Sequence, residues 1–298
     1  MINQEYFLNL TQPLVLDGPI GTRLIEEGEK LNTPLWSAET LMTNPDLVQK
    51  IHKEYIQAGA DIITTNTFRT NPYSISRSKI NSESSTLVKI AVDIAKTSIK
   101  SSHRNNLILA GSNAPADDCY STFRSCSYDE LLRNHSQHIS SLMENNVDFI
   151  LNETFGDKEE IEIVSKFCYQ NKIPFAVSIL IRTESETYHG QNLRETLESI
   201  LRYEPLFVSL NCARPKTILN AANLLQEFKP FGVYPNLGSV ESFNTDKLVR
   251  DISVSKFTEF VNNMIETQAK VIGVCCGGKP DDISVIRHLI DKRMNENH

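Results

Sequence analysis

The residues best suited to chemistry in this 298-residue chain are three cysteines, two of them adjacent. Cys275 and Cys276 follow the apolar run 271–274 and precede two glycines. Neighbouring cysteines rarely bond to each other, because disulfide geometry strains the peptide between them. Cys212 ends a second strand-like run at 207–212. A catalytic zinc takes three protein ligands and leaves a fourth position open, so the three thiols predict a Zn²⁺ site if the fold brings them together.

Three thiolates favour one kind of reaction at such a zinc. The ion is then electron-rich, activates water poorly and suits a soft fourth ligand such as a substrate thiol, which coordination deprotonates. The bound sulfur becomes a nucleophile at neutral pH, where a free thiol is mostly protonated. Alkylation of that sulfur is the predicted chemistry. The simpler interpretation of each cysteine alone is a small buried apolar residue, and only the set of three favours a metal.

The other cysteines and the histidines lack ligand-like spacing. The remaining cysteines fall in a loop and on an expected helix, away from the expected strand ends: Cys119, Cys126 and Cys168. Their roles stay open. His135 and His138 lie on an expected outer helix and are predicted to be surface residues, and His52 has no ligand-like spacing. His189 lies in a polar loop, where nothing in the sequence ties it to a site.

Alternating strands and helices must position these residues. Short apolar, β-branched runs predict strands at 14–16, 62–65, 107–110, 149–151, 175–180, 206–210, 231–234 and 271–274. Amphipathic stretches predict helices at 45–58, 86–101, 128–145, 158–170, 193–202, 216–228, 255–268 and 280–293. The clearest is 45–58, with Asn44 placed to cap it and Gly59 to end it. The count predicts an α/β fold with a single (β/α)8 TIM barrel over residues 1–298, and a doubly wound open sheet with a second domain is the alternative.

A barrel places chemistry at the carboxyl ends of its strands. Polar or metal-binding residues follow the eight expected strands in turn: Asp17, Asn66, Ser112, Glu153, Arg182, Asn211 with Cys212, Asn236, and Cys275 with Cys276. Cys212, Cys275 and Glu153 all follow even-numbered strands, which supply the same interior layers. Glu153 could serve as a general base, as a clamp for a substrate ammonium, or as a helix-start carboxylate. Asp17-Gly18 could hold an amine or form a turn.

Composition limits the partners. The net charge of −7 and the pI near 5.6 argue against nucleic acid or an anionic membrane as the main partner. No apolar run approaches the roughly 20 residues that span a bilayer. The first residues lack the basic and apolar character of a signal peptide, and six cysteines in such a chain are typical of reduced thiols. We therefore expect a cytoplasmic protein.

Several segments together resemble the homocysteine S-methyltransferase family over nearly the whole chain. The matching segments are 16–22, 35–38, 44–47, 58–61, 65–68, 148–154, 211–212, 233–236 and 275–277. The resemblance implies a zinc held by Cys212, Cys275 and Cys276. It also implies that Asp17, Gly18 and Glu153 hold the amino-acid end of homocysteine. Thr154, Asn66, Trp36 and Tyr234, in matching motifs, are the other expected substrate-binding residues.

The implied reaction is direct transfer of a methyl group from an onium donor, S-methylmethionine or S-adenosylmethionine, to the homocysteine thiol. A sulfonium donor loses its charge as the bond breaks, so the site needs in-line positioning and a cation-tolerant pocket more than acid or base catalysis. Trp36 and Tyr234 are candidates to face the cation through their rings. The segments 35–38 and 44–47 look most like the branch that uses S-methylmethionine.

Three positions depart from the family pattern and leave the donor open: Val274 before the cysteine pair, Ala114 after the third strand and His189 after the fifth. Two other classes also remain open. A barrel aldolase needs a lysine at a strand end, and Lys279 lies beyond the glycines. A zinc-binding barrel with an altered acceptor or donor, or without turnover, is the second alternative.

Overall fold

A closed barrel of parallel strands forms the centre of the computed structural model, which describes residues 2–242 and 245–296. Neighbouring strands follow the order β1-β11-β8-β7-β5-β4-β3-β2, with every pairing parallel. The barrel strands are β1 (Leu14–Val15), β2 (Ile62–Thr64), β3 (Ile108–Asn113), β4 (Phe149–Phe155), β5 (Phe175–Thr183), β7 (Val208–Asn211), β8 (Phe231–Tyr234) and β11 (Val271–Ile272). A parallel bridge between Leu16 and Ile62 joins the first strand to the second. This closure makes the fold a TIM barrel, so the open-sheet alternative is wrong.

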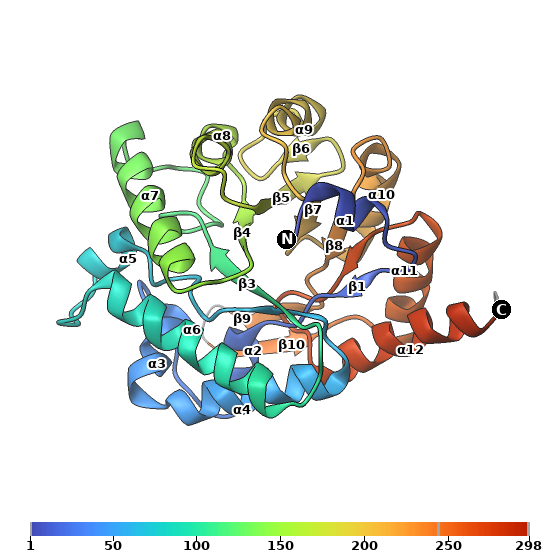
Figure 1. Cartoon of the computed structure of the whole chain (residues 1–298), viewed down its shortest axis with the longest axis horizontal. Coiled ribbons are helices and arrows are strands. Elements are labelled where there is room, and N and C mark those ends of the chain that lie inside the picture. The colour runs from blue at the N-terminus through green and yellow to red at the C-terminus, as the bar shows by residue number, and fades with distance from the viewer. Residues whose placement is uncertain (1, 243–244, 297–298) are drawn as a thin grey trace.

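Eight helices surround the strands (Figure 1) and match the eight predicted from amphipathic spacing. They are α4 (Pro45–Ala58), α6 (Ser84–Ser101), α7 (Tyr128–Glu144), α8 (Lys158–Gln170), α9 (Leu193–Leu201), α10 (Pro215–Leu225), α11 (Val254–Glu266) and α12 (Pro280–Glu296). Gly59 ends α4 in a left-handed conformation, as predicted. Asn44 precedes the helix, but its side chain donates to Glu29 at 2.8 Å instead of capping.

The sequence patterns missed the short elements that decorate the rim and the base. These are α1 (Gln4–Leu8), α2 (Ile20–Glu26), the 3-10 turn η1 (Trp36–Glu39), α3 (Thr40–Thr43), α5 (Pro72–Ser76), β6 (Glu186–Thr187) and the hairpin of β9 (Gly238–Ser242) with β10 (Thr245–Arg250). They are too short to show a period of 2 or 3.6 residues. Several of them shape the mouth of the barrel.

The core consists of one large layer between strands and helices and a second cluster inside the barrel. Phe7 of α1 joins the inner cluster, with its ring centroid 4.9 Å from that of Phe207 and 6.4 Å from that of Phe149. Since Phe149 begins β4 and Phe207 precedes β7, α1 covers the amino ends of the strands. The opposite end is left for the substrate cavity. In the part of the chain that the structure describes, no helix is long and apolar enough to cross a membrane.

The prediction that His135 and His138 are surface residues is wrong, because both are fully buried on the inner face of α7. Each ring lies near the Asn113 side-chain oxygen, at 3.3 Å from Nδ1 of His135 and 2.9 Å from Nδ1 of His138. Nε2 of His135 also meets Glu160 at 2.9 Å. The sequence prediction placed both histidines on the outer face of the helix because they are polar, although an imidazole with two hydrogen-bond partners is readily buried.

Candidate metal centre and substrate cavity

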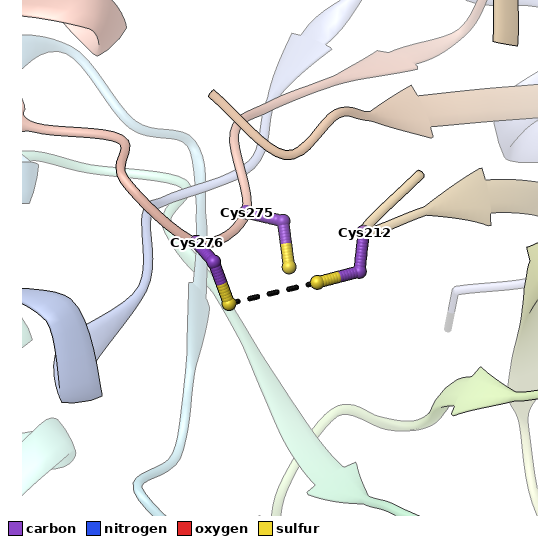
Figure 2. A group of neighbouring side chains, drawn as sticks. All are labelled: Cys212, Cys275 and Cys276. Atoms are coloured by element: carbon purple, nitrogen blue, oxygen red, sulfur yellow. Dashed lines mark hydrogen bonds between the residues drawn. The ribbon is translucent and has the colours of Figure 1, made fainter. Parts of the chain in front are cut away.

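The three predicted cysteines converge at the carboxyl ends of their strands (Figure 2). Cys212 follows β7, and Cys275 and Cys276 follow β11. Their Sγ atoms all lie within 4.8 Å of one another, with Sγ of Cys212 3.5 Å from Sγ of Cys276. A tetrahedral zinc with bonds of about 2.3 Å needs sulfurs about 3.8 Å apart. The three thiols therefore fit a metal of this kind with small adjustments, and none of them forms a disulfide.

Backbone hydrogen bonds from three strand ends fix the cysteine loops. The Cys212 amide donates to the Tyr234 carbonyl at 3.1 Å and the Cys275 amide to the Pro235 carbonyl at 2.8 Å. Cys212 itself has φ of 53°, a left-handed conformation that costs energy for a non-glycine residue and is typical of functional sites. Gly277 also has positive φ, and a Cβ there would lie 2.5 Å from the Gly238 nitrogen. Only glycine fits this turn.

Val274, the departure beside the cysteine pair, is accommodated by the glycine that follows the pair. The valine is 2% exposed and belongs to the outer core layer. A Cβ at Gly278 would lie 2.4 Å from a Val274 methyl group. The branched side chain thus occupies space that the missing Cβ of Gly278 provides, and the triad keeps its geometry.

Hydrogen bonds among the three thiols shift their pKa values in opposite directions. Donation from Cys212 and Cys275 holds the pKa of the Cys276 thiol well below its ordinary value. Donation to its two neighbours raises the pKa of Cys275 well above that value. A divalent cation would stabilise the thiolate form of all three cysteines.

A cavity of about 590 Å³ opens over the triad. All ten predicted site residues line it: Asp17, Gly18, Trp36, Asn66, Glu153, Thr154, Cys212, Tyr234, Cys275 and Cys276. They come from the carboxyl-terminal parts of six different strands or from the loops that follow them, so only the closed barrel brings them together. A cavity of this size accommodates more than one small molecule.

Glu153 presents a carboxylate beside the triad. Burial raises its pKa to about 7, against the hydrogen bond that its Oε1 accepts from the Ser112 hydroxyl, and the nearby Cys276 raises it further. Tyr234, 2% exposed, lies on the same side, and burial raises the pKa of its phenol, which stays neutral. A carboxylate of this kind gains from a cationic partner such as a substrate ammonium.

Both carboxylate oxygens of Asp17, which was predicted to bind the substrate amine, are hydrogen-bonded within the protein. Its two oxygens accept from the Thr64 amide and the Thr64 hydroxyl, each at 2.9 Å. Burial raises the pKa of this carboxyl well above its ordinary range. Gly18 is needed because a Cβ there would lie 2.5 Å from the Tyr55 ring. Asp17-Gly18 therefore fixes the first strand end against the second and forms a wall of the cavity.

Two amides brace residues in strained conformations. The Asn66 amide donates to the Ser37 carbonyl at 3.0 Å and its oxygen accepts from the Ser37 hydroxyl at 2.6 Å, next to Trp36, whose φ is 50°. Asn211 likewise exchanges hydrogen bonds with the backbone and hydroxyl of Thr154, whose φ is 66°. Asn66 thus positions the Trp36 loop, and Asn211 is a bracing residue that the site prediction did not include.

The loop after β3 supplies cavity residues that the sequence interpretation placed elsewhere. The expectation that Cys119 lies away from the rim is wrong, since Cys119 is buried and lines the cavity. The next residue, Tyr120, places its hydroxyl 3.0 Å from Sγ of Cys212. Cys126 and Cys168 are buried away from the triad. His189 lines a separate small cavity of about 20 Å³.

The fold and the site define a TIM barrel with three cysteines that could hold a metal ion at its carboxyl-end mouth. A family model described as homocysteine S-methyltransferase matches residues 14–290. Homocysteine S-methyltransferase 1 of Arabidopsis thaliana is 28% identical and covers 94% of each chain. Selenocysteine Se-methyltransferase of Brassica oleracea var. italica is 26% identical over 94% of this chain and 89% of its own.

The fold itself has a close counterpart. The crystal structure of the Escherichia coli homocysteine methyltransferase MmuM in its metallated form superposes with a TM-score of 0.82, at 24% identity over 95% of this chain and 98% of that one. The present chain belongs to the homocysteine S-methyltransferase family, because the family model covers nearly all of it.

Proposed function

We propose that this chain transfers a methyl group from an onium donor to the thiol of homocysteine, giving methionine, with a zinc ion held by Cys212, Cys275 and Cys276. The observation that carries the proposal is the convergence of three Sγ atoms within 4.8 Å at the floor of a 590 Å³ cavity. A bound zinc would lower the pKa of a coordinated substrate thiol and supply a nucleophilic sulfur at neutral pH.

The remaining residues would bind and orient. Glu153 would hold the substrate ammonium, since its raised pKa shows that the carboxylate has too little solvation or counter-charge without one. Asp17 would contribute through its field, because its oxygens are already occupied by Thr64. Trp36 and Tyr234 line the cavity and would offer ring faces to the onium carbon or its charge.

The displacement balances without an acid or a base. The sulfur lone pair forms the new bond to the methyl carbon, and the electron pair of the old bond leaves with the donor heteroatom, which becomes neutral. The protein therefore has to exclude water and align three atoms. The proton of the thiol is lost earlier, on binding.

A selenol acceptor is the second candidate. The similarity to the Brassica selenocysteine enzyme, 26%, is nearly equal to that of the Arabidopsis homocysteine enzyme, 28%. A soft metal site accepts a selenolate as readily as a thiolate.

The test combines metal analysis with product formation. Purified protein should contain about one zinc per chain and form methionine from homocysteine with S-methylmethionine, S-adenosylmethionine or glycine betaine. Cys212→Ala and Cys276→Ala should lose both metal and product, whereas Cys168→Ala, a buried cysteine outside the cavity, should keep both. Full metal content and activity in the first two variants would refute the assignment. Selenocysteine in place of homocysteine tests the second candidate.

A further inference from the structure

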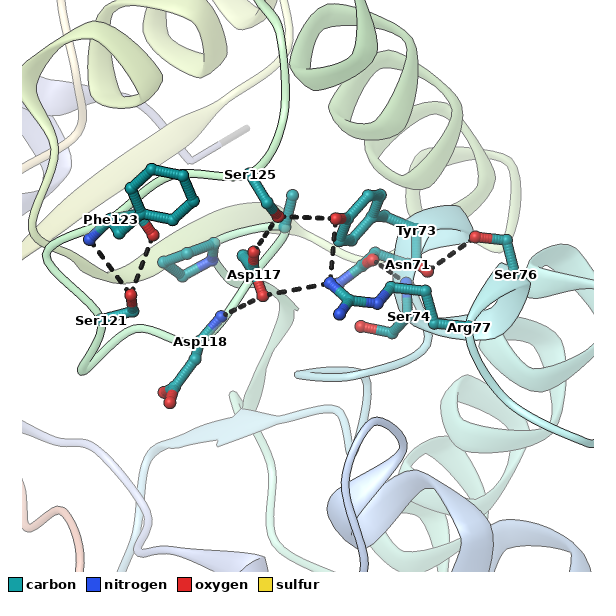
Figure 3. A network of polar contacts seen from close by, with 12 residues as sticks. Asn71, Tyr73, Ser74, Ser76, Arg77, Asp117, Asp118, Ser121, Phe123 and Ser125 are labelled. Carbon is teal, nitrogen blue, oxygen red and sulfur yellow. Dashed lines mark hydrogen bonds and ion pairs between the residues drawn. The ribbon is translucent and has the colours of Figure 1, made fainter.

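A second set of charged groups lines the same cavity at the loops that follow β2 and β3 (Figure 3). Arg69 and Arg77 come from the loop around α5, and Asp117 and Asp118 come from the loop after β3. Neither the sequence patterns nor the family motifs singled out these four residues. They lie apart from the metal-binding cysteines but border the same space.

The two loops are joined by hydrogen bonds that hold Asp117 as an anion. Nη1 of Arg77 donates to the Tyr73 hydroxyl at 2.9 Å and lies 3.5 Å from Oδ1 of Asp117. The other Asp117 oxygen accepts from the Ser125 hydroxyl, which also meets Tyr73 at 2.7 Å. Burial opposes ionisation, but the Ser125 hydroxyl, the Asp118 amide and the two arginines hold the pKa of Asp117 below its usual value.

Both arginines keep donors that no described residue uses. Arg69 donates only through Nη1, to the carbonyls of Pro115 at 3.3 Å and Asp117 at 2.6 Å. Arg77 also uses only Nη1. The Nη2 and Nε groups of two guanidiniums are therefore available to an anion, and a planar fork suits a carboxylate. Asp118 is exposed and accepts through Oδ1 alone, from the Tyr120 amide at 3.0 Å.

A purely structural role explains this arrangement poorly. The Arg77–Asp117 pair is long, and the Arg77 side chain is 53% exposed, so the pair stabilises the fold little. The loops are already tied by Arg69 to two backbone carbonyls. Two cationic forks beside two carboxylates, facing a cavity, match the charges of a free amino acid.

Resting on the proposed function, we propose that Arg69, Arg77, Asp117 and Asp118 form a subsite for the α-carboxylate and α-ammonium groups of the methyl donor. The arginines bind the carboxylate. Asp118, which accepts only through Oδ1, binds the ammonium, and Asp117 contributes through its charge. The donor is then an α-amino-acid onium compound, and its charged methyl-bearing centre points toward the cysteines. Glycine betaine lacks an ammonium N–H and fits this subsite poorly.

The subsite borders the same cavity as the three cysteines. Asp117 and Asp118 line this cavity together with Tyr120, whose hydroxyl is 3.0 Å from Sγ of Cys212. The Cys119 thiol, which lies between Asp118 and Tyr120 in the sequence, interacts electrostatically with Arg69 and Asp118 and also with Cys276. The amino-acid head and the methyl-bearing centre of the donor would therefore occupy one continuous cavity.

The balance of charge also favours an onium ligand. Four carboxylates and two guanidiniums line the cavity in the described part of the chain, in addition to the thiols. A cation in the cavity would stabilise the ionised form of these carboxylates, and a sulfonium amino acid carries one net positive charge, whereas a neutral zwitterion carries none.

Calorimetric titration of the full-length zinc-loaded protein tests the proposal without turnover. The probes are S-methyl-L-methionine and dimethylsulfoniopropionate, which has the same dimethylsulfonium and carboxylate groups on a chain one carbon shorter and has no ammonium. We expect R77M to weaken both probes about tenfold or more, and D118N to weaken only S-methyl-L-methionine. R202M, which removes an exposed arginine paired with Glu162 outside the cavity, should change neither.

In the same titration S-adenosyl-L-methionine should also lose affinity in R77M, because it carries the same amino-acid head, and the wild-type affinities show which of the two compounds the protein prefers. Unchanged S-methyl-L-methionine affinity in R77M would overturn the subsite, and so would an equal loss of both probes in D118N. Separate zinc analysis and homocysteine titration report on the metal and acceptor. Normal zinc and homocysteine binding without binding of any onium probe would refute the subsite and leave the acceptor half of the proposed function standing.

Discussion

Replacing Glu153 by glutamine should stabilise the protein at alkaline pH while weakening its substrate binding. The side chain keeps its shape and can still accept from the Ser112 hydroxyl, which now bonds the carboxylate. What changes is the charge. Because burial raises the folded-state pKa from 4.5 to about 7, ionisation of this group lowers the stability of the wild-type fold as the pH rises.

The size of the effect follows from linkage. The raised pKa means that the folded state holds this proton more strongly than the unfolded state. The stability of the fold is therefore fully present below pH 4.5, and part of it is lost as the pH rises through 7. At pH 8 the charged carboxylate costs the fold at most about 3 kcal/mol, since one pKa unit corresponds to about 1.4 kcal/mol. For a chain of this length that equals a rise on the order of 5 °C in the melting temperature of Glu153→Gln.

The assay is thermal unfolding of the reduced, metal-free protein at pH 8 and at pH 4, with Glu144→Gln on the outer surface as the control. We expect stabilisation of Glu153→Gln at pH 8, no difference at pH 4, and no effect of the control at either pH. In the zinc-loaded protein, loss of a charged partner for the substrate ammonium should raise the KM for homocysteine about 10- to 100-fold. Equal stability at pH 8, or an unchanged KM, would refute the role given to Glu153.

Three further outcomes follow from the structure. His52 is fully buried with neither ring nitrogen hydrogen-bonded, and burial lowers its pKa to about 4. The folded protein therefore loses stability as the pH falls below 6.5. His52→Leu should abolish about 2 kcal/mol of the fall in unfolding free energy between pH 7 and pH 5, measured by urea unfolding. Tyr120→Phe removes a hydroxyl from the Cys212 sulfur and should weaken zinc retention about tenfold against a chromophoric chelator; unchanged retention would contradict this contact. Gly278→Ala places a methyl group 2.4 Å from Val274 and should destabilise the protein by about 1–3 kcal/mol, with Val274→Ala in the same chain restoring part of the loss if the clash is the cause.

The barrel and its triad were predictable because both depend on periodic signals. Each strand gives a short β-branched run and each helix an amphipathic stretch, and all eight of each were found near the expected residues. Once the barrel is assumed, residues that end strands must meet at one rim, which is why Cys212 and Cys276, 64 positions apart, could be placed together. Burial of His135 was missed because its partners, Asn113 and Glu160, come from other elements.

The loops after β2 and β3 resisted prediction for a different reason. Residues 114–127 have no period, so nothing in their order indicates that Cys119 turns into the cavity while Tyr120 reaches a cysteine of another loop. Their conformation depends on distant partners such as Arg69, whose bonds to the carbonyls of Pro115 and Asp117 shape the turn. On the proposed function, the strand ends would hold the reacting sulfur and these irregular loops would surround the space for the donor. We therefore expect a change of donor within this fold to alter the loops and to leave the cysteines intact, which would explain a preserved triad beside altered residues such as Ala114.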